Sequence, residues 1–137
     1  EMSASLVGSE MCIRDRPKYN AFDNLRLLAD IKKIASDEDI RNSLERVGLN
    51  SDLKVKKFSL GMKQRLNVAQ AIFEKQNIIL LDEPTNALDN DGVQLIYSII
   101  KEEKQRGATV IVATHHKEDL DELCDTILTV SEGRLIE

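Results

Sequence analysis

Two acidic residues that follow an apolar run are the first candidates for chemistry in this chain of 137 residues. Residues 78–81 (IILL) are the short, continuous apolar segment expected of a strand buried in a parallel sheet, and Asp82 and Glu83 come directly after it. Ligands of parallel sheets bind at the edge where the strands end. The Asp82 carboxylate suits Mg²⁺, which prefers oxygen ligands, and Glu83 would polarise an attacking water. The alternative is a solvated strand terminus without a ligand.

A second candidate site is the sequence FSLGMKQR at residues 58–65. Ser59 is of a type that caps a helix N-terminus, and Gly61 lets the backbone come close to a partner. The free N–H groups and the positive dipole end of that helix suit an anion such as a terminal phosphate. Judged on these residues alone, an ordinary capped helix is the stronger interpretation.

The apolar spacing predicts a run of helices in front of the acidic pair. Apolar residues recur every three or four positions after Ala21, after Ser36 and after Ser59, which is the helical pattern. The first helix should bury a stripe that runs to Ile31, and Gly48 is placed for a left-handed cap of the second. We therefore expect residues 17–76 to form a small helical subdomain.

Strands and helices alternate from residue 77 to the end. Residues 109–113 (TVIVA) are predicted to form a second buried strand, after a helix that ends near Gly107. A short helix, a third strand over residues 126–130 and a last strand over residues 134–136 should follow. This order predicts parallel strands joined by crossover helices, so residues 77–137 are assigned to an α/β core.

Residues 1–16 show neither helical nor strand periodicity. They also lack the charged start and small-residue cleavage site of a signal peptide. We interpret them as an extension that is either not native to the protein or disordered.

The composition is that of an ordinary globular protein and argues against several classes of function. The net charge of −5 disfavours electrostatic capture of nucleic acid or anionic lipid, and 4% aromatic residues disfavour a base-stacking surface. No apolar run approaches the roughly 20 residues that a membrane-spanning helix needs. Cys12 and Cys124 are far apart and indicate neither a disulfide framework nor a zinc site.

Four motifs in a fixed order resemble the ATP-binding cassette (ABC) family, the nucleotide-binding subunits of ABC transporters. They are FSLGMKQR at 58–65, IILLDEPT at 78–85, NALD at 86–89 and ATH at 113–115. The resemblance covers residues 18–137. It implies part of a P-loop NTPase of RecA-like fold, a parallel sheet with flanking helices, together with the family's small helical subdomain.

The resemblance also assigns roles to single residues. Ser59 and Gly61 match the signature motif, which binds the γ-phosphate of ATP held by the opposite cassette of a dimer. Leu60 and Met62 depart from the commonest form of that motif, in which a glycine and a glutamine are usual. Asp82 matches the family's Mg²⁺-binding aspartate, and Glu83 matches its catalytic glutamate. Asp89 matches the D-loop aspartate, and His115 matches the switch histidine. Of the two adjacent histidines we assign the switch role to His115 and expect His116 to be a solvated residue at a helix start.

The motif that would complete an ATP site does not occur in the sequence. No glycine is followed by lysine, so there is no G-x-x-x-x-G-K-[ST] loop, whose backbone N–H groups and lysine hold the β- and γ-phosphates. We therefore interpret the chain as the C-terminal part of a cassette, expected to bind ATP poorly by itself.

The resemblance implies that the intact protein hydrolyses Mg²⁺-ATP to power transport. Its expected partners are a second cassette and a transmembrane permease, which would hold it at the cytoplasmic face of the cell membrane, with no role for nucleic acid. Two alternatives stay open at this point. One is an inactive fragment or module that binds a transporter's membrane subunit, and the other is a soluble ABC ATPase without a transport function.

Overall fold

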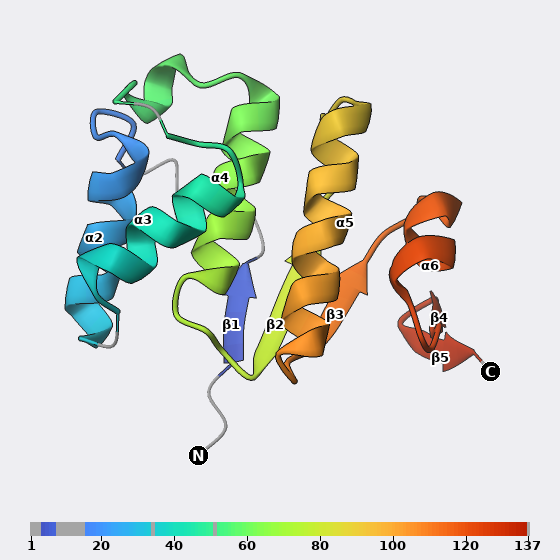
Figure 1. The fold of residues 1–137 in the computed structure, drawn as a ribbon. Helices are drawn as coiled ribbons and strands as arrows, with labels where there is room; N and C mark the ends of the chain where they lie inside the picture. The colour runs from blue at the N-terminus through green and yellow to red at the C-terminus, as the bar shows by residue number, and fades with distance from the viewer. Residues whose placement is uncertain (1–3, 8–15, 34, 51, 137) are drawn as a thin grey trace.

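A three-stranded parallel sheet lies behind the helices of the fold (Figure 1). The computed structural model describes residues 4–7, 16–33, 35–50 and 52–136, and structural statements refer to these. The strands are β1 (Ala4–Val7), β2 (Ile78–Asp82) and β3 (Thr109–Ala113), in the order β1-β2-β3. In the register of the two longer strands, Asp82 pairs with Ala113, so both strands end at the same edge. This edge receives the acidic pair, as the sequence predicts.

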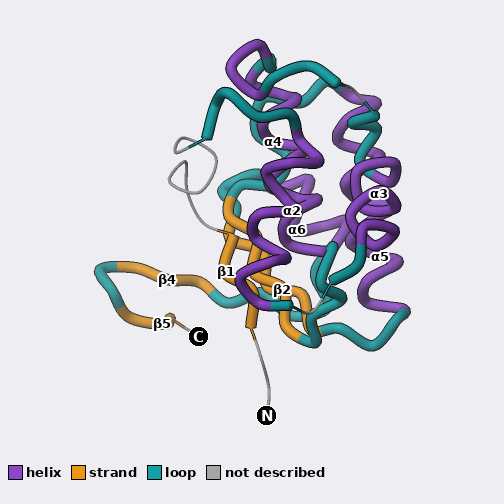
Figure 2. Tube along the Cα trace, turned by 90° about the vertical axis from the view of Figure 1, so that its left-hand side faces the viewer, coloured by secondary structure: helices purple, strands orange, loops and turns teal. Residues whose placement is uncertain are grey.

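Helices connect and cover these strands, and a small hairpin follows them. Figure 2 shows the helices gathered on one side of the three parallel strands. The remaining elements are α2 (Ala21–Lys32), α3 (Asp37–Arg46), the 3₁₀ helix η1 (Val55–Lys57), α4 (Leu60–Ile72), α5 (Asn90–Gln105), α6 (Lys117–Leu123), β4 (Thr129–Ser131) and β5 (Arg134–Ile136). Within the described ranges, no helix is both long and apolar enough to cross a membrane.

Local caps set where the helices of the N-terminal half begin and end. Ser36 and Asp39 form a reciprocal capping box at the start of α3, and the Ser59 hydroxyl accepts the backbone N–H of Met62 at the start of α4. Gly48 has φ +70°, the left-handed conformation that a glycine adopts without strain. The predicted helix starts and this cap are confirmed.

The apolar stripe predicted for α2 is only partly correct. Leu25 is buried, whereas Ile31 is 72% exposed. The helix ends at Lys32, and Lys33 takes a left-handed conformation directly after it. The buried positions of α2 are spaced by four (Ala21, Leu25 and Ala29), whereas residues spaced by three shift by about 60° around the helix at each step, so Ile31 faces away from the core.

Strand β3 differs from the prediction of a strand buried on both faces. Its residues alternate, with Val110 and Val112 half-buried against the core and Ile111 53% exposed. The reason is that the described helices cover one face of the sheet, so side chains of opposite parity point away from them.

The strand predicted over residues 126–130 does not join the parallel sheet. Strand β4 pairs antiparallel with β5 in a separate two-stranded sheet whose residues are all exposed. Glu132 and Gly133, between the two strands, both have positive φ, as a tight hairpin turn requires. The turn geometry thus folds this segment back on itself.

Part of the segment predicted to lack regular structure is a strand. Residues 4–7 form β1, which pairs in parallel with residues 78–81 of β2. Four residues are too few for an alternating pattern to show, and the pairing uses backbone hydrogen bonds that any sequence without proline offers. Most of the other residues in 1–16 lie outside the described ranges.

Candidate functional site

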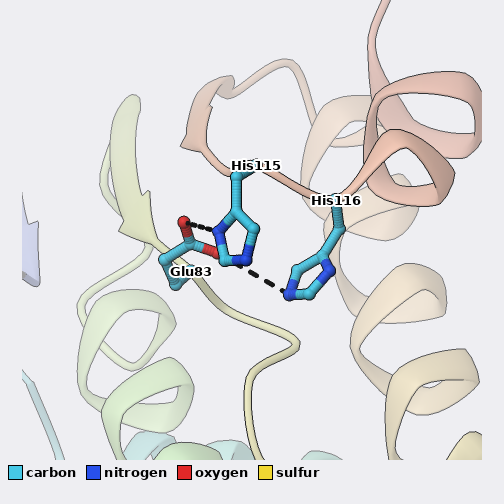
Figure 3. A group of neighbouring side chains, drawn as sticks. All are labelled: Glu83, His115 and His116. Atoms are coloured by element: carbon cyan, nitrogen blue, oxygen red, sulfur yellow. Dashed lines mark hydrogen bonds and ion pairs between the residues drawn. The ribbon is translucent and has the colours of Figure 1, made fainter.

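Asp82 and Glu83 leave the end of β2 in different environments. Asp82 is the last residue of the strand and is exposed. Glu83 continues the pairing through its backbone, because its N–H donates to the carbonyl of Ala113 over 2.8 Å. Its φ of +47° is a left-handed conformation that is unusual for a residue with a side chain, and the buried Pro84 follows. The Glu83 side chain points toward His115, in the segment after β3 (Figure 3).

Two histidines from the segment after β3 meet the Glu83 carboxylate (Figure 3). His115 Nδ1 lies 2.6 Å from Glu83 Oε1, across a separation of 32 residues in the sequence. His116 Nε2 lies 4.0 Å from Glu83 Oε2 and 2.9 Å from Oδ1 of Asn86. The two imidazole rings lie with their centroids 4.2 Å apart.

His116 stands at a helix start, as expected, and its side chain is partly solvated. His116 is the N-cap residue of α6. Its side chain is 40% exposed, compared with 70% for His115. The hydrogen bond to Asn86 and the neighbouring ring of His115 explain why His116 is the less solvated of the two.

A buried carboxylate that the sequence analysis did not single out supports this segment. Asp119 is 2% exposed and accepts hydrogen bonds from the hydroxyls of Thr85 (2.8 Å), Thr114 (2.8 Å) and Tyr97 (2.7 Å). Thr114 Oγ1 in turn accepts the backbone N–H of His116 over 3.1 Å. Burial, and then the hydrogen bond to Asp119, raise the pKa of the Tyr97 hydroxyl. The turns that carry Glu83 and the histidines are therefore tied to one buried acid.

The backbone of Glu83 is also tied to α4. Gln64 Nε2 donates to the Glu83 carbonyl over 2.9 Å. Sequence periodicity cannot predict the contact between Gln64 and Glu83, or the contact between Asp119 and Thr85, because the partners are far apart in the sequence. The only available signal for Gln64 was its place inside the FSLGMKQR motif.

Ser59, Gly61 and Asp89 make a separate set of contacts, around the starts of α4 and α5. A side chain at Gly61 would meet the Ala87 carbonyl at 3.0 Å, so the start of α4 packs closely on the loop before α5. Asp89 caps α5 by accepting the N–H of Gly92 over 2.9 Å, and Arg65 Nη2 lies 3.9 Å from its carboxylate. Among these described residues, no hydrogen bond or ion pair joins Ser59 or Asp89 to Glu83 or His115.

The side chains at the sheet edge fit the metal that the sequence predicts. Asp82 offers an exposed carboxylate at the end of β2, and a magnesium ion commonly takes one or two carboxylates together with phosphate oxygens and water. Asp82 therefore suits a magnesium–phosphate group, whereas the imidazoles of His115 and His116 do not suit a cation that prefers oxygen.

The fold is that of an ATP-binding cassette. Among solved structures, the ATP-binding cassette MJ0796, a dimer in a post-hydrolysis state bound to ADP and phosphate, matches with a TM-score of 0.67 and 28% sequence identity. The match covers 74% of this chain and 48% of that chain. The sequence model of the family described as ABC transporter matches residues 4–86. The chain belongs to the ABC transporter family of ATP-binding proteins.

Curated relatives carry the same family name. An uncharacterized ABC transporter ATP-binding protein, YybJ of Bacillus subtilis, is 60% identical over 121 residues, which are 87% of this chain and 56% of that protein. The lantibiotic transport ATP-binding protein SrtF of Streptococcus pyogenes is 37% identical, with 90% of this chain and 56% of that protein covered. The bacitracin transport ATP-binding protein BcrA of Bacillus licheniformis is 40% identical, with 88% and 39% covered. The chain thus spans about half the length, or less, of the relatives it matches.

Proposed function

We propose that this chain is part of the ATP-binding subunit of an ABC transporter, and that the intact subunit hydrolyses ATP to power transport. The observation that carries the proposal is the 2.6 Å contact between Glu83 and His115 at the sheet edge, in a chain that belongs to the ABC transporter family. In this proposal residues 17–76 are the helical subdomain and residues 77–137 belong to the ATPase core.

Each site residue has a distinct task in this proposal. Asp82 holds Mg²⁺, which neutralises charge on the phosphate oxygens when it is bound. Glu83 accepts a hydrogen bond from the attacking water and directs it toward the γ-phosphate. His115, held by Glu83, contacts the same phosphate. The Glu83–His115 hydrogen bond supports these tasks because it places the base and the histidine side by side.

The remaining site residues act across an interface between two cassettes. Ser59 and Gly61 bind the γ-phosphate of ATP held by a second cassette, through the free N–H groups at the start of α4. Asp89 lies beside that interface and links the two sites. This part of the proposal is supported by the exposure of Ser59 and Asp89, and by the dimeric state of the MJ0796 cassette.

The subunit is proposed to act with a transmembrane permease at the cytoplasmic face of the membrane. The names of the relatives SrtF and BcrA, which refer to lantibiotic and bacitracin transport, support a transport role. The net charge of −5 offers little attraction for nucleic acid, which disfavours a soluble ABC ATPase that acts on DNA or RNA.

The decisive variant is Glu83→Gln in the full-length protein. We expect its ATP turnover to fall by roughly 10²–10⁴-fold, the usual contribution of a general base, while ATP binding persists because the amide keeps the size of the side chain. Turnover is measured by phosphate release and binding by equilibrium titration with a fluorescent ATP analogue. The matched control is Glu45→Gln on the exposed face of α3, which should keep the wild-type rate. Wild-type turnover in Glu83→Gln would refute the assignment.

A further inference from the structure

Three side chains of the kinds that bind transition metals converge beside the sheet edge (Figure 3). A carboxylate oxygen of Glu83 and one ring nitrogen each of His115 and His116 all lie within 4.8 Å of one another. We propose that these three side chains form a binding site for a divalent transition-metal ion of the zinc type, separate from the magnesium site assigned to Asp82.

The donor types select the metal. Zinc binds imidazole nitrogen and carboxylate oxygen readily, and sites with three protein ligands leave a further position for water. Magnesium takes oxygen ligands almost exclusively, so two imidazoles among three donors disfavour it. The Glu83, His115 and His116 set therefore discriminates between the two metals by chemistry alone.

Only small side-chain movements are needed to bring the three donor atoms to the separations found around zinc. Ligand atoms around a tetrahedral zinc lie roughly 3.3 Å apart, which follows from metal–ligand distances of about 2.0–2.2 Å. The 2.6 Å separation between His115 Nδ1 and Glu83 Oε1 must open, and the 4.0 Å separation between His116 Nε2 and Glu83 Oε2 must close. Both imidazoles are exposed enough to rotate, since 70% and 40% of their side-chain surfaces are accessible.

The backbone that carries the donors is already fixed. The Glu83 N–H donates to the Ala113 carbonyl over 2.8 Å, and the His116 N–H donates to Thr114 Oγ1 over 3.1 Å. Thr114 is itself held by the buried Asp119. A site whose backbone is ordered before binding loses less entropy when the ion enters, which favours affinity.

Binding changes which ring nitrogens carry protons. At present Nδ1 of His115 donates to Glu83, and Nε2 of His116 donates to the Asn86 carbonyl oxygen. For these nitrogens to bind the ion, each proton moves to the other nitrogen of its ring by exchange with solvent. The His116–Asn86 hydrogen bond is lost in exchange for the bond to the metal.

The consequence for activity rests on the proposed function. An ion bound to the Glu83 carboxylate occupies the electron pair with which Glu83 would orient water. Zinc should therefore inhibit ATP hydrolysis by occupying this site, without competing for Asp82.

The first test measures zinc binding to the full-length protein without nucleotide, by competition with a chromophoric chelator. We expect His116→Ala to weaken binding at least tenfold, and Cys124→Ser, which removes a thiol directly after α6, to leave it unchanged. Thermal melting checks that both variants fold. Equal zinc affinity in the wild type and His116→Ala overturns the proposal.

A second variant keeps a ligand at the same position. His116→Cys should restore binding and, with Co²⁺ as the ion, add a thiolate-to-metal charge-transfer band that the wild type lacks. If the cobalt complex of His116→Cys shows no such band, residue 116 does not contact the ion and the proposal fails.

The inhibition is tested by phosphate release, with each variant compared with its own rate in the absence of zinc. We expect zinc to lower the rate of the wild type at concentrations that leave His116→Ala unaffected. Equal inhibition of both overturns the inhibitory role, because it would come from zinc bound to ATP or elsewhere. If the intact protein hydrolyses no ATP, the proposed function fails, while the binding and cobalt measurements still decide the metal site.

Discussion

Asp119, which no sequence pattern singled out, joins three segments of the candidate site. Its two carboxylate oxygens accept the hydroxyls of Thr85, Thr114 and Tyr97, which come from three separate segments of the chain. Asp119 is 2% exposed, so water cannot readily take the place of a hydroxyl that is lost. Its contribution is therefore both to stability and to the position of Glu83 and the histidines.

Replacing this carboxylate should be costly. We expect Asp119→Ala to lower the free energy of unfolding by more than roughly 3 kcal/mol, because hydrogen bonds to a charged group contribute about 1.5–3 kcal/mol each and three hydroxyls lose their acceptor. Urea denaturation followed by circular dichroism measures the change. The control Asp121→Ala, on an exposed position of the same helix, should stay within about 0.5 kcal/mol of the wild type. Equal stability of the two variants would show that the network contributes nothing.

The start of α3 shows how a local signal connects to a neighbouring helix. Asp39 Oδ2 accepts from the Ser36 backbone N–H (3.0 Å) and hydroxyl (2.7 Å), and its other oxygen lies 2.8 Å from Lys75 Nζ, just beyond α4. The Lys75 hydrogen bond, and then those from Ser36, hold the pKa of the Asp39 carboxyl well below its usual range. The capping box thus also fixes α3 to the end of α4.

This pKa shift predicts a loss of stability in acid. A carboxyl whose pKa is lowered by folding stabilises the native state above its unfolded pKa of about 3.9, and this contribution disappears as the pH falls below that value. We expect Asp39→Asn to cost about 1 kcal/mol at pH 7, as for other helix caps, and progressively less between pH 4 and pH 2. Thermal melting over this pH range measures it. The control is Glu38→Gln, which removes a charge from the same turn. If the cost of Asp39→Asn does not change with pH, the lowered pKa of Asp39 does not contribute to stability.

The helical half and the α/β half of the molecule are joined by an ion-pair network. Arg46 of α3 contacts Glu103 of α5 over 2.7 Å and Glu102 over 2.8 Å. Glu103 is 3% exposed and also contacts Arg106, whose guanidinium donates to the carbonyls of Lys75 and Gln76. The buried acid therefore connects α3, α5 and the segment that leads from α4 into β2.

Replacing Glu103 should destabilise the fold much more than replacing Glu102. We expect Glu103→Gln to lower the free energy of unfolding by roughly 2–3 kcal/mol, because both guanidinium groups lose a charge-assisted partner in a poorly solvated place. Glu102→Gln, whose side chain is 61% exposed, should cost less than about 1 kcal/mol. Guanidinium denaturation curves of the two variants provide the comparison. A larger loss for Glu102→Gln would mean that the exposed pair holds the halves together.

The sequence by itself determined the features that depend on neighbouring residues. Ser36, Gly48 and Ser59 marked helix ends correctly, because a cap is completed within one helical turn. The continuous apolar run at 78–81 placed Asp82 and Glu83 at a strand end, because a strand stops where its apolar residues give way to acids and proline.

Only the tertiary structure decided which distant groups meet. The Glu83–His115 contact follows from the alignment of two parallel strands, and the burial of Asp119 follows from three segments that close over it. The exposed face of β3 and the separate β4–β5 hairpin depend on which helices cover the sheet and on two positive φ angles. Hydrogen bonds within one turn are encoded where they form, whereas contacts between segments depend on how the whole chain packs.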